Sequence, residues 1–446
     1  MSEVVIIGGG LTGLMMANAL SHTGLHSDKS LSGAITLIDR AESDAEMPDE
    51  RTTTINAAGA RMLQALGVWD RLAMPPSPIM RIEVAEGAPA TGLAARRRRP
   101  HDLSWEAGDT PMGFVVENGD LQAALRSALK DRTGLKDRSG DDAVNRSGIT
   151  EIRKAEVRAF TTQTDGTGRA NLTFAGGLNS DDQNRERQIS TNLVVACDGA
   201  RSLLADLAGL PLREERQYQT AIVSTLRAEK HHGNTAYQRF LPTGPFALMP
   251  LQGNDLSLVW TLPNAKAEAL IEADIPTFEA ACFEAFGQQL GYLQLVGNRL
   301  SWPLHPTIRP QITAPGLILA GDAAHAIHPL AGQGYNLALA DAAILADLLL
   351  AAKQRGLPAS HPSIRGEYES RRKSERLGMS FATSGLNHLF ARAPSPVRRA
   401  AGATFTLMDR LPVKSIFSDI AEGGQLADAA LLRGELPGDR LKNRKF

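Results

Sequence analysis

The chain has 446 residues, of which 43% are hydrophobic, so it can bury a large core and form two or three domains. Its formal net charge of −1 provides no bulk attraction to nucleic acid or to an anionic membrane, and no nucleic-acid partner is expected. The two cysteines, Cys197 and Cys282, are too few for a disulfide framework or a zinc site, so we expect no metal and a cytoplasmic location.

The apolar segments predict neither a leader nor a membrane span. The apolar run that starts at Val4 follows no charged segment, so we expect no signal peptide. The longest apolar stretch, residues 337–352, contains Asp341 and Asp347 and is predicted to be a buried helix that falls short of a membrane span. Any membrane contact would therefore be peripheral.

A strand, a glycine-rich turn and a helix are predicted at the start of the chain. Residues 4–7 (VVII) form a continuous apolar run, which is typical of a strand buried on both faces. Gly8, Gly10 and Gly13 follow in the pattern G-x-G-x-x-G, and residues 14–20 are predicted to be helical. The first glycine allows a tight turn, the second lets the backbone approach a pyrophosphate, and the third lets helix and strand pack closely. The free N–H groups of the helix would bind the phosphates.

A second strand provides the acidic partner of this motif. Residues 34–38 are predicted to form a strand that ends at Asp39, whose carboxylate can accept hydrogen bonds from both ribose hydroxyls. Asp39 lies farther from the glycines than usual, which a polar insertion at residues 22–32 explains. Together these elements predict a dinucleotide site, but they do not distinguish NAD from FAD.

Three later segments have further nucleotide-binding character. Arg51 precedes residues 52–56, which are predicted to open a helix. Its positive charge suits either contact with a pyrophosphate or an ordinary position on the solvent-exposed surface. A buried strand at residues 192–196 leads to a turn at Asp198 and Gly199. Another strand, residues 316–320, leads into a long block, GDAAHAIHPLAGQGYNLALAD, at residues 321–341.

These blocks together resemble the group A flavoprotein monooxygenases. More narrowly, the chain is similar to the ubiquinone-biosynthesis hydroxylases, the 2-polyprenyl-6-methoxyphenol hydroxylase group. The resemblance spans about residues 3–385. The narrower likeness is carried by residues 49–51 (DER), 113–118 (GFVVEN), 218–222 (YQTAI), 236–240 (AYQRF), 244–251 (GPFALMPL), 257–260 (SLVW) and the block at 321–341.

The resemblance implies FAD as the cofactor and NAD(P)H as a transient co-substrate. It implies that Arg51 and Asn118 lie near the FAD pyrophosphate, that Asp322 binds the ribityl chain, and that residues 329–334 line the flavin ring. A turn around Asp198 would be shared by FAD and NAD(P)H. The expected cofactor-binding residues are Gly8, Gly10, Gly13, Asp39, Arg51, Asn118, Asp198, Gly199, Arg201, Asp322, Pro329, Gly332, Gln333, Gly334 and Asn336.

The chain also departs from the family pattern. Asp39 replaces the more usual Glu, Ala338 stands where Gly is common, Gln238 where Glu is frequent, and Cys197 where Ala is common. None of these changes removes an expected cofactor contact, but they leave the exact member of the family open.

The expected fold is α/β, with a Rossmann-type FAD-binding domain, an inserted antiparallel-sheet substrate domain and a C-terminal helical region. Phe246, Leu248, Met249, Leu258 and Trp260 suit either an apolar substrate tunnel or a plain core. The expected bounds are 1–75, 106–205 and 306–355 for the FAD-binding domain, 76–105 and 206–305 for the substrate domain, and 356–446 for the helical region.

The expected reaction is hydroxylation of the aromatic ring of a polyprenylated phenol in ubiquinone biosynthesis, with O2 and NAD(P)H. Two alternatives stay open: a flavin monooxygenase of a soluble aromatic metabolite, and an FAD-bearing scaffold subunit of a biosynthetic complex. A flavin halogenase is disfavoured because W-x-W-x-I-P is absent from the sequence. An NAD-dependent dehydrogenase is disfavoured because the block at residues 321–336 would have no role.

The catalytic base and the partners are less well defined by the sequence. His325 and His328 flank the expected flavin loop and suit a proton-transfer role or a structural one. Residues 392–419 mix basic and apolar side chains, which favours peripheral contact with the inner face of the membrane or packing on the core or a partner. A ubiquinone-biosynthesis complex is a further expected partner.

Overall fold

The computed structural model describes residues 2–23, 35–41, 49–87, 89, 101–133, 149–163, 168–176, 186–214, 218–327, 334–391 and 428–437. Four predicted site residues, His328, Pro329, Gly332 and Gln333, lie outside these ranges. So does the predicted basic stretch at residues 392–419.

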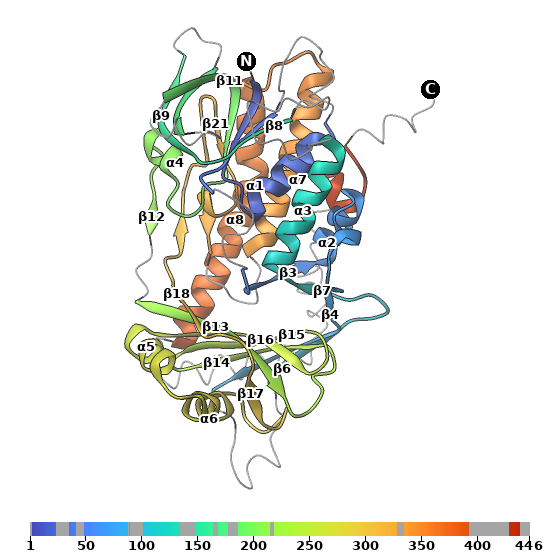
Figure 1. Ribbon diagram of the computed structural model, residues 1–446, viewed down its shortest axis with the longest axis vertical. Helices are drawn as coiled ribbons and strands as arrows, with labels where there is room; N and C mark the ends of the chain where they lie inside the picture. The colour runs from blue at the N-terminus through green and yellow to red at the C-terminus, as the bar shows by residue number, and fades with distance from the viewer. Residues whose placement is uncertain are drawn as a thin grey trace.

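Two large sheets form the two halves of the molecule, the first in the upper part of Figure 1 and the second in the lower part. The core of the first sheet is a parallel run of strands in the order β21-β11-β1-β2-β8. Strand β1 lies at the centre because all of its residues except Glu3 are buried. The strands of this sheet are β1 (Ser2–Ile7), β2 (Ile35–Ile38), β8 (Ile149–Ile152), β9 (Ala155–Thr162), β10 (Ala170–Gly176), β11 (Glu186–Ala196), β20 (Thr313–Ala314) and β21 (Leu317–Leu319).

Helices cover this sheet as expected for a Rossmann-type arrangement. Helix α1 (Leu11–Ser21) packs against α3 (Asn118–Thr133) and α7 (Gly334–Gln354), and the three run side by side in Figure 1. Within the described residues, α7 is the one helix long and apolar enough to cross a membrane, and 78% of its most apolar window is buried. The prediction of a buried core helix is therefore confirmed. The expectation that no segment reaches spanning length was wrong, because the helix extends beyond residues 337–352 at both ends.

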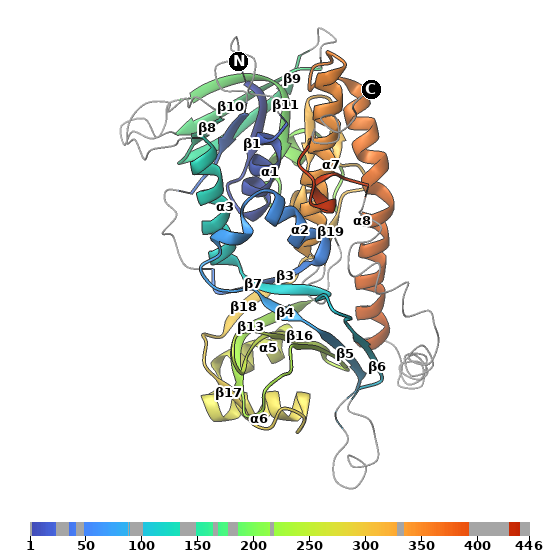
Figure 2. The ribbon, with the colours of Figure 1, turned by 90° about the vertical axis from the view of Figure 1, so that its right-hand side faces the viewer.

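The second sheet has the order β17-β13-β16-β15-β14-β5-β6, with β18 also paired to β13. The predicted antiparallel pairing holds for β13 to β16, whereas β5 joins β14 in parallel. Helices α5 (Asn264–Glu272) and α6 (Ile275–Phe286) lie on the face turned away from the first sheet (Figures 1 and 2). The strands are β5 (Arg81–Glu86), β6 (Leu103–Glu106), β13 (Gln219–Ala228), β14 (Thr235–Leu241), β15 (Gly244–Pro250), β16 (Asp255–Pro263), β17 (Leu293–Leu295) and β18 (Leu300–Pro303).

Side chains along these strands alternate between the two faces of the sheet. The face on which each apolar residue lies therefore shows whether it lines a tunnel or belongs to the core. Phe246, Leu248, Leu258 and Trp260 all pack in the cluster that the sheet forms with α5 and α6. The rings of Phe246 and Trp260 meet edge to face at 5.1 Å. Met249 lies in a different cluster, which the other face of the sheet forms with Met112 and Val115. All five candidate lining residues are therefore core, four of them under α5 and α6 and Met249 on the opposite face.

Two small sheets connect the halves. Strands β3 (Thr52–Asn56), β7 (Gly113–Glu117) and β4 (Ser77–Ile79) form one, and β12 (Arg213–Glu214), β19 (Thr307–Ile308) and β22 (His325–Ala326) form the other. The prediction that residues 52–56 open a helix was wrong. The β-branched side chains in this segment favour a strand, and helix α2 (Ala57–Ala65) begins only where Asn56 Oδ1 accepts a hydrogen bond from the Gly59 N–H at 2.7 Å.

The C-terminal part of the chain ties the halves together. Helix α8 (Pro362–Ala391) packs beside α7 and reaches β14 and β15 of the second sheet, along the side seen in Figure 2. The short 3-10 helix η8 (Leu431–Arg433) returns to pack on α2. The remaining elements are α4 (Leu203–Leu207) and the 3-10 helices η2 (Trp69–Arg71) and η5 (Gly321–Ala323). The expected domain bounds stay a prediction.

Leu258→Ala is expected to lower the free energy of unfolding by about 2–5 kcal/mol, because it leaves a cavity between the second sheet and its helices. Urea unfolding followed by tryptophan fluorescence measures this change. Met249→Leu, on the opposite face, is the matched control and should cost less than about 1.5 kcal/mol. Equal costs for the two variants would contradict the close packing of Leu258 against the helices.

Candidate functional site

The turn between β1 and α1 requires glycine at two of its three motif positions for packing reasons. Gly8 has φ +101°, and a Cβ there would overlap the carbonyl oxygen of Cys197. A Cβ at Gly13 would overlap the carbonyl oxygen of Gly8. Gly10 differs, because it is exposed and a Cβ there would meet no atom within 4 Å. The fold itself therefore leaves room at Gly10, at the uncapped N-terminus of α1, for a ligand.

Asp39 ends strand β2 beside this turn. A Cβ at Gly9 would overlap its carboxylate, so the acid and the glycine turn are in direct contact. Arg126 of α3, which is 7% exposed, joins both: its Nη2 donates to the Gly9 carbonyl at 3.2 Å and lies 3.8 Å from Asp39 Oδ2. Its Nη1 donates to Glu151 Oε1 at 2.9 Å. Sequence reasoning missed Arg126, although an arginine on the apolar face of α3 was a visible signal.

Arg51 and Asn118, predicted for the same region, both contact Asp49. Arg51 donates from Nε and Nη2 to the two oxygens of Asp49, each at 2.7 Å, and Asn118 Nδ2 donates to the same carboxylate at 3.1 Å. Burial acts to raise the pKa of Asp49, but these donors and the charge of Arg51 outweigh it, so the pKa lies below its usual value. Asn118 Oδ1 is buried and has no hydrogen-bond partner among the described residues, which leaves an acceptor for a ligand.

The segment around Arg51 also lies at the boundary between the first half of the molecule and the second sheet, which is called the seam below. Asn298 donates to Glu50 at 3.2 Å, the Arg51 guanidinium lies 4.3 Å from the centre of the Trp302 ring, and the hydroxyls of Thr52 and Ser257 are 2.7 Å apart. Three successive residues, 50 to 52, are therefore bound to the second sheet.

The end of β11 lies beside the turn between β1 and α1, because Gly8 contacts Cys197. Burial raises the pKa of Asp198, although hydrogen bonds from Ser202 and nearby backbone N–H groups oppose the shift. Its Oδ1 has no partner among the described residues. Gly199 has φ +86° with open space at its Cβ position, and Arg201 is exposed. This turn is available to a ligand.

The turn after β21 meets the first turn from the other side. Gly321 has φ +59°, and a Cβ there would lie 2.6 Å from Thr12 Oγ1 of α1. Asp322 is open to solvent on one side yet closely surrounded by protein, and this desolvation raises the pKa of its carboxyl. The positive charges of His325 and Arg51 oppose the shift, so Asp322 lies within the field of Arg51.

His325 and Asn336 are both buried, but only Asn336 has hydrogen-bond partners for its side chain among the described residues. His325 is 1% exposed, and its Nε2 lies 3.1 Å from Asp341 Oδ2. This favours the structural role over direct contact with a substrate, and its role as a base stays a prediction. Asn336 Oδ1 accepts from the Asn56 N–H at 3.0 Å, and its Nδ2 donates to the Thr54 carbonyl at 2.9 Å. These bonds fasten the first turn of α7, which starts at Gly334, to β3.

The turns described above follow the carboxyl ends of β1, β2, β11 and β21, where a doubly wound sheet binds its ligand. They present a free helix N-terminus, carboxylates for hydroxyl groups at Asp39 and Asp322, and unpartnered buried oxygens on Asn118 and Asp198. This donor and acceptor set fits an extended dinucleotide such as FAD. The roles of the individual residues stay predictions.

Relatives of known function share nearly the whole chain. The family described as the FAD binding domain matches residues 1–374. Ubiquinone hydroxylase UbiL of Rhodospirillum rubrum is 34% identical over 426 residues, which cover 95% of this chain and 90% of that protein. The 3-demethoxyubiquinol 3-hydroxylase of Escherichia coli is 30% identical over 399 residues, which cover 87% and 89% of the two chains.

Solved structures show the same fold at low sequence identity. The p-nitrophenol 4-monooxygenase PnpA of Pseudomonas putida DLL-E4 matches with a TM-score of 0.70 and 15% identity, over 96% of this chain and 98% of that one. PqsL of Pseudomonas aeruginosa, described as a probable FAD-dependent monooxygenase, has a TM-score of 0.66 and 17% identity, over 90% and 98%. The predicted fold class, the cofactor FAD and the co-substrate NAD(P)H are thereby confirmed. The chain belongs to the FAD-dependent monooxygenases, in the family that contains the ubiquinone-biosynthesis hydroxylases.

Proposed function

We propose that this protein hydroxylates the aromatic ring of a polyprenylated phenol in ubiquinone biosynthesis. The observation that carries the proposal is the likeness, over about nine-tenths of both chains, to two proteins named as ubiquinone-pathway hydroxylases.

FAD, when bound, takes electrons from NAD(P)H and activates O2 for transfer of one oxygen atom to an electron-rich ring. The chain would hold it in an extended form across the ends of the parallel strands. Gly10 and the N-terminus of α1 would bind the pyrophosphate, with Arg51 and Asn118 close by. Asp39 would bind the adenosine ribose and Asp322 the ribityl chain. The unpartnered oxygens of Asn118 and Asp198 support this placement.

The substrate would bind between the two halves. The face of the second sheet turned toward the first half carries Ala247 and Met249, which pack with Met112, Val115 and Ile79. These side chains are 2–5% exposed and pack against one another, so the substrate ring is proposed to bind beside this apolar boundary, which helps to exclude water from the reacting centre.

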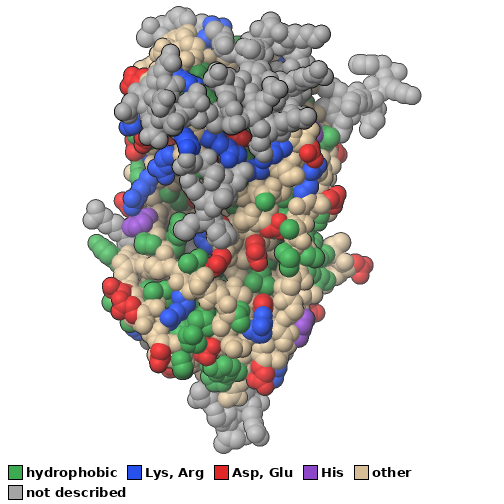
Figure 3. All heavy atoms as spheres, viewed as in Figure 1, with side chains coloured by type: hydrophobic (Ala, Val, Ile, Leu, Met, Phe, Trp, Pro, Cys, Tyr) green, Lys and Arg blue, Asp and Glu red, His purple; other side chains and the backbone are tan. Residues whose placement is uncertain are grey.

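Partners and location follow from the proposed substrate. We propose a cytoplasmic protein that contacts the inner face of the membrane peripherally and works within a ubiquinone-biosynthesis complex. Basic side chains gather in a band across the upper half of the face in Figure 3, at the level of α1 and α4. A locally positive surface attracts the phosphates of NAD(P)H and of anionic lipids, although the whole chain has a net charge of −1.

Gly10→Val is expected to weaken FAD binding at least about tenfold while leaving the stability of the FAD-free protein unchanged, because the new side chain enters space that only the pyrophosphate needs. FAD titration of the apoprotein and thermal unfolding measure the two effects. Gly13→Ala is the contrasting variant and should destabilise the apoprotein itself, since its Cβ overlaps the Gly8 carbonyl. Unchanged FAD affinity in Gly10→Val would reject the proposed pyrophosphate position.

Asp322→Ala should lose most of its bound FAD during purification, because the ribityl hydroxyls lose their acceptor. Asp322→Asn keeps an acceptor oxygen and should retain more of the cofactor. The flavin absorbance per protein chain gives the comparison. A fully yellow Asp322→Ala protein would show that the ribityl chain binds elsewhere.

The proposed reaction is tested in cells that lack this protein, by mass spectrometry of ubiquinone and its precursors. We expect less ubiquinone and the accumulation of a prenylated phenol that lacks one hydroxyl group, which would also identify the ring position. Normal ubiquinone levels, once a second hydroxylase of the same ring position has been deleted, would instead favour a soluble aromatic substrate.

A further inference from the structure

The inward face of helix α8 is polar although it is fully buried. Tyr368, Arg372 and Arg376 recur every four residues, which places them on one face of the helix, and each is 0% exposed. The Tyr368 hydroxyl donates to the carbonyl of Leu319 at 3.1 Å, and Arg376 Nη1 donates to the carbonyl of Arg309 at 3.0 Å. The first contact binds α8 to the strand β21 that leads to Asp322, and the second binds it to the residue that follows β19.

Arg372 makes the central contact of this face. Its Nε donates to Asp341 Oδ1 at 2.6 Å, its Nη2 donates to the Leu337 carbonyl at 3.0 Å, and its Nη1 pairs with Glu375. Asp341 is also 0% exposed. Burial alone would raise the pKa of Asp341, but the charges of Arg372 and His325 outweigh it and hold the pKa well below its usual value. The carboxylate therefore stays charged inside the protein.

Asp341 also contacts the turn after β21, which contains Gly321 and Asp322. Its Oδ2 accepts a hydrogen bond from the Gly321 N–H at 2.7 Å, and it also lies close to His325 Nε2. Gly321 is held in the left-handed region, against Thr12, and directly precedes Asp322. Arg372 is thus connected to Asp322 by two successive contacts. Arg372 pairs with the Asp341 carboxylate, and this carboxylate accepts a hydrogen bond from Gly321, the residue before Asp322.

We propose that Arg372 is a positioning residue for the cofactor: by holding the Asp341 carboxylate in place, it sets the Gly321 turn and the direction of Asp322. Without Arg372 the buried carboxylate would lose its main cation, and it would take up a proton or turn away. Either change weakens the bond to the Gly321 N–H and lets Asp322 shift. The proposal rests on the placement of FAD at Asp322 given above.

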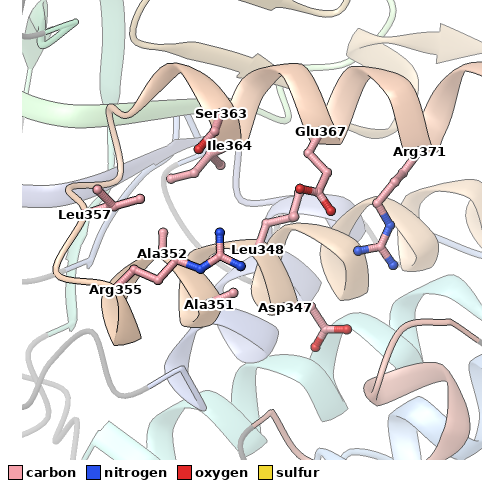
Figure 4. Close-up of a pocket in the computed structure, with 10 residues that line it drawn as sticks. All are labelled: Asp347, Leu348, Ala351, Ala352, Arg355, Leu357, Ser363, Ile364, Glu367 and Arg371. Atoms are coloured by element: carbon pink, nitrogen blue, oxygen red, sulfur yellow. The ribbon is translucent and has the colours of Figure 1, made fainter.

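The neighbouring arginine offers a matched control. Arg371 is partly exposed and lines a cavity of about 210 Å³ between α7 and α8, together with Asp347, Arg355 and Glu367. Figure 4 shows these side chains around the cavity. Arg371→Met therefore removes the same kind of side chain from the same helix without touching the buried pair.

The test compares FAD affinity with the stability of the apoprotein. Arg372→Met is expected to raise the Kd for FAD at least about tenfold, whereas Arg371→Met should change it by no more than about twofold. FAD fluorescence during titration of the apoprotein gives Kd, and thermal unfolding without FAD gives stability. In the double variant Asp341→Asn with Arg372→Met, the amide oxygen still accepts from Gly321 and the buried carboxylate that Arg372 neutralised is gone, so affinity should recover toward that of the wild type.

Two results would overturn the proposal. One is an Arg372→Met protein that unfolds at a lower temperature but binds FAD as tightly as the wild type, because Arg372 would then be structural only. The other is a double variant that regains stability without regaining FAD affinity. If Arg372→Met does not fold, Asp341→Ala and Asp341→Asn replace it, and the alanine variant, which lacks the acceptor, must bind FAD more weakly.

The result for Asp322→Ala separates this proposal from the one on which it rests. Weak FAD binding in Asp322→Ala together with normal binding in Arg372→Met would overturn the positioning role alone. Normal binding in both would reject the placement of FAD at Asp322.

Discussion

Close contact between three turns, at positions where only glycine fits, is the constraint on which the rest of the structure depends. The turn after β1 touches the end of β11 at Gly8, and the turn after β21 touches α1 at Gly321. A side chain at either glycine would push the turns apart. Because Gly8 meets the backbone of Cys197 and Gly321 meets the side chain of Thr12, the N–H groups at the start of α1 and the carboxylates that follow the strands face one common space. The core of each sheet holds these turns in place.

Much of this arrangement could be predicted, because tight backbone turns require particular residues at particular positions, and these are visible in the sequence. Glycines at fixed spacing after an apolar run predicted the first turn, and Asp39 followed from its place at the end of the next strand. The strands of the second sheet could be predicted from alternating residues, as in residues 221–226. The family resemblance identified the cofactor, which the first motif alone did not distinguish from NAD.

The features that could not be predicted depend on contacts between residues far apart in the chain. Arg126 contacts Gly9, and Arg372 contacts Asp341, but a sequence shows the type of each residue and not its partner. Phe246 and Leu258 suited a tunnel as well as a core, because hydrophobicity does not reveal which face of a sheet a helix covers. The same limit applies to β5, whose parallel pairing with β14 joins segments about 150 residues apart.

The seam at residues 50 to 52 has a consequence for motion. Glu50, Arg51 and Thr52 are each bound to the second sheet, while the same short segment pairs with Asp49 and Asn118 beside the cofactor turns. A hinge movement of the second sheet would therefore carry the Arg51 guanidinium with it and change the electric field at Asp322. Under the proposed function, a substrate that shifts the second sheet would therefore alter the charge environment of Asp322 through Arg51.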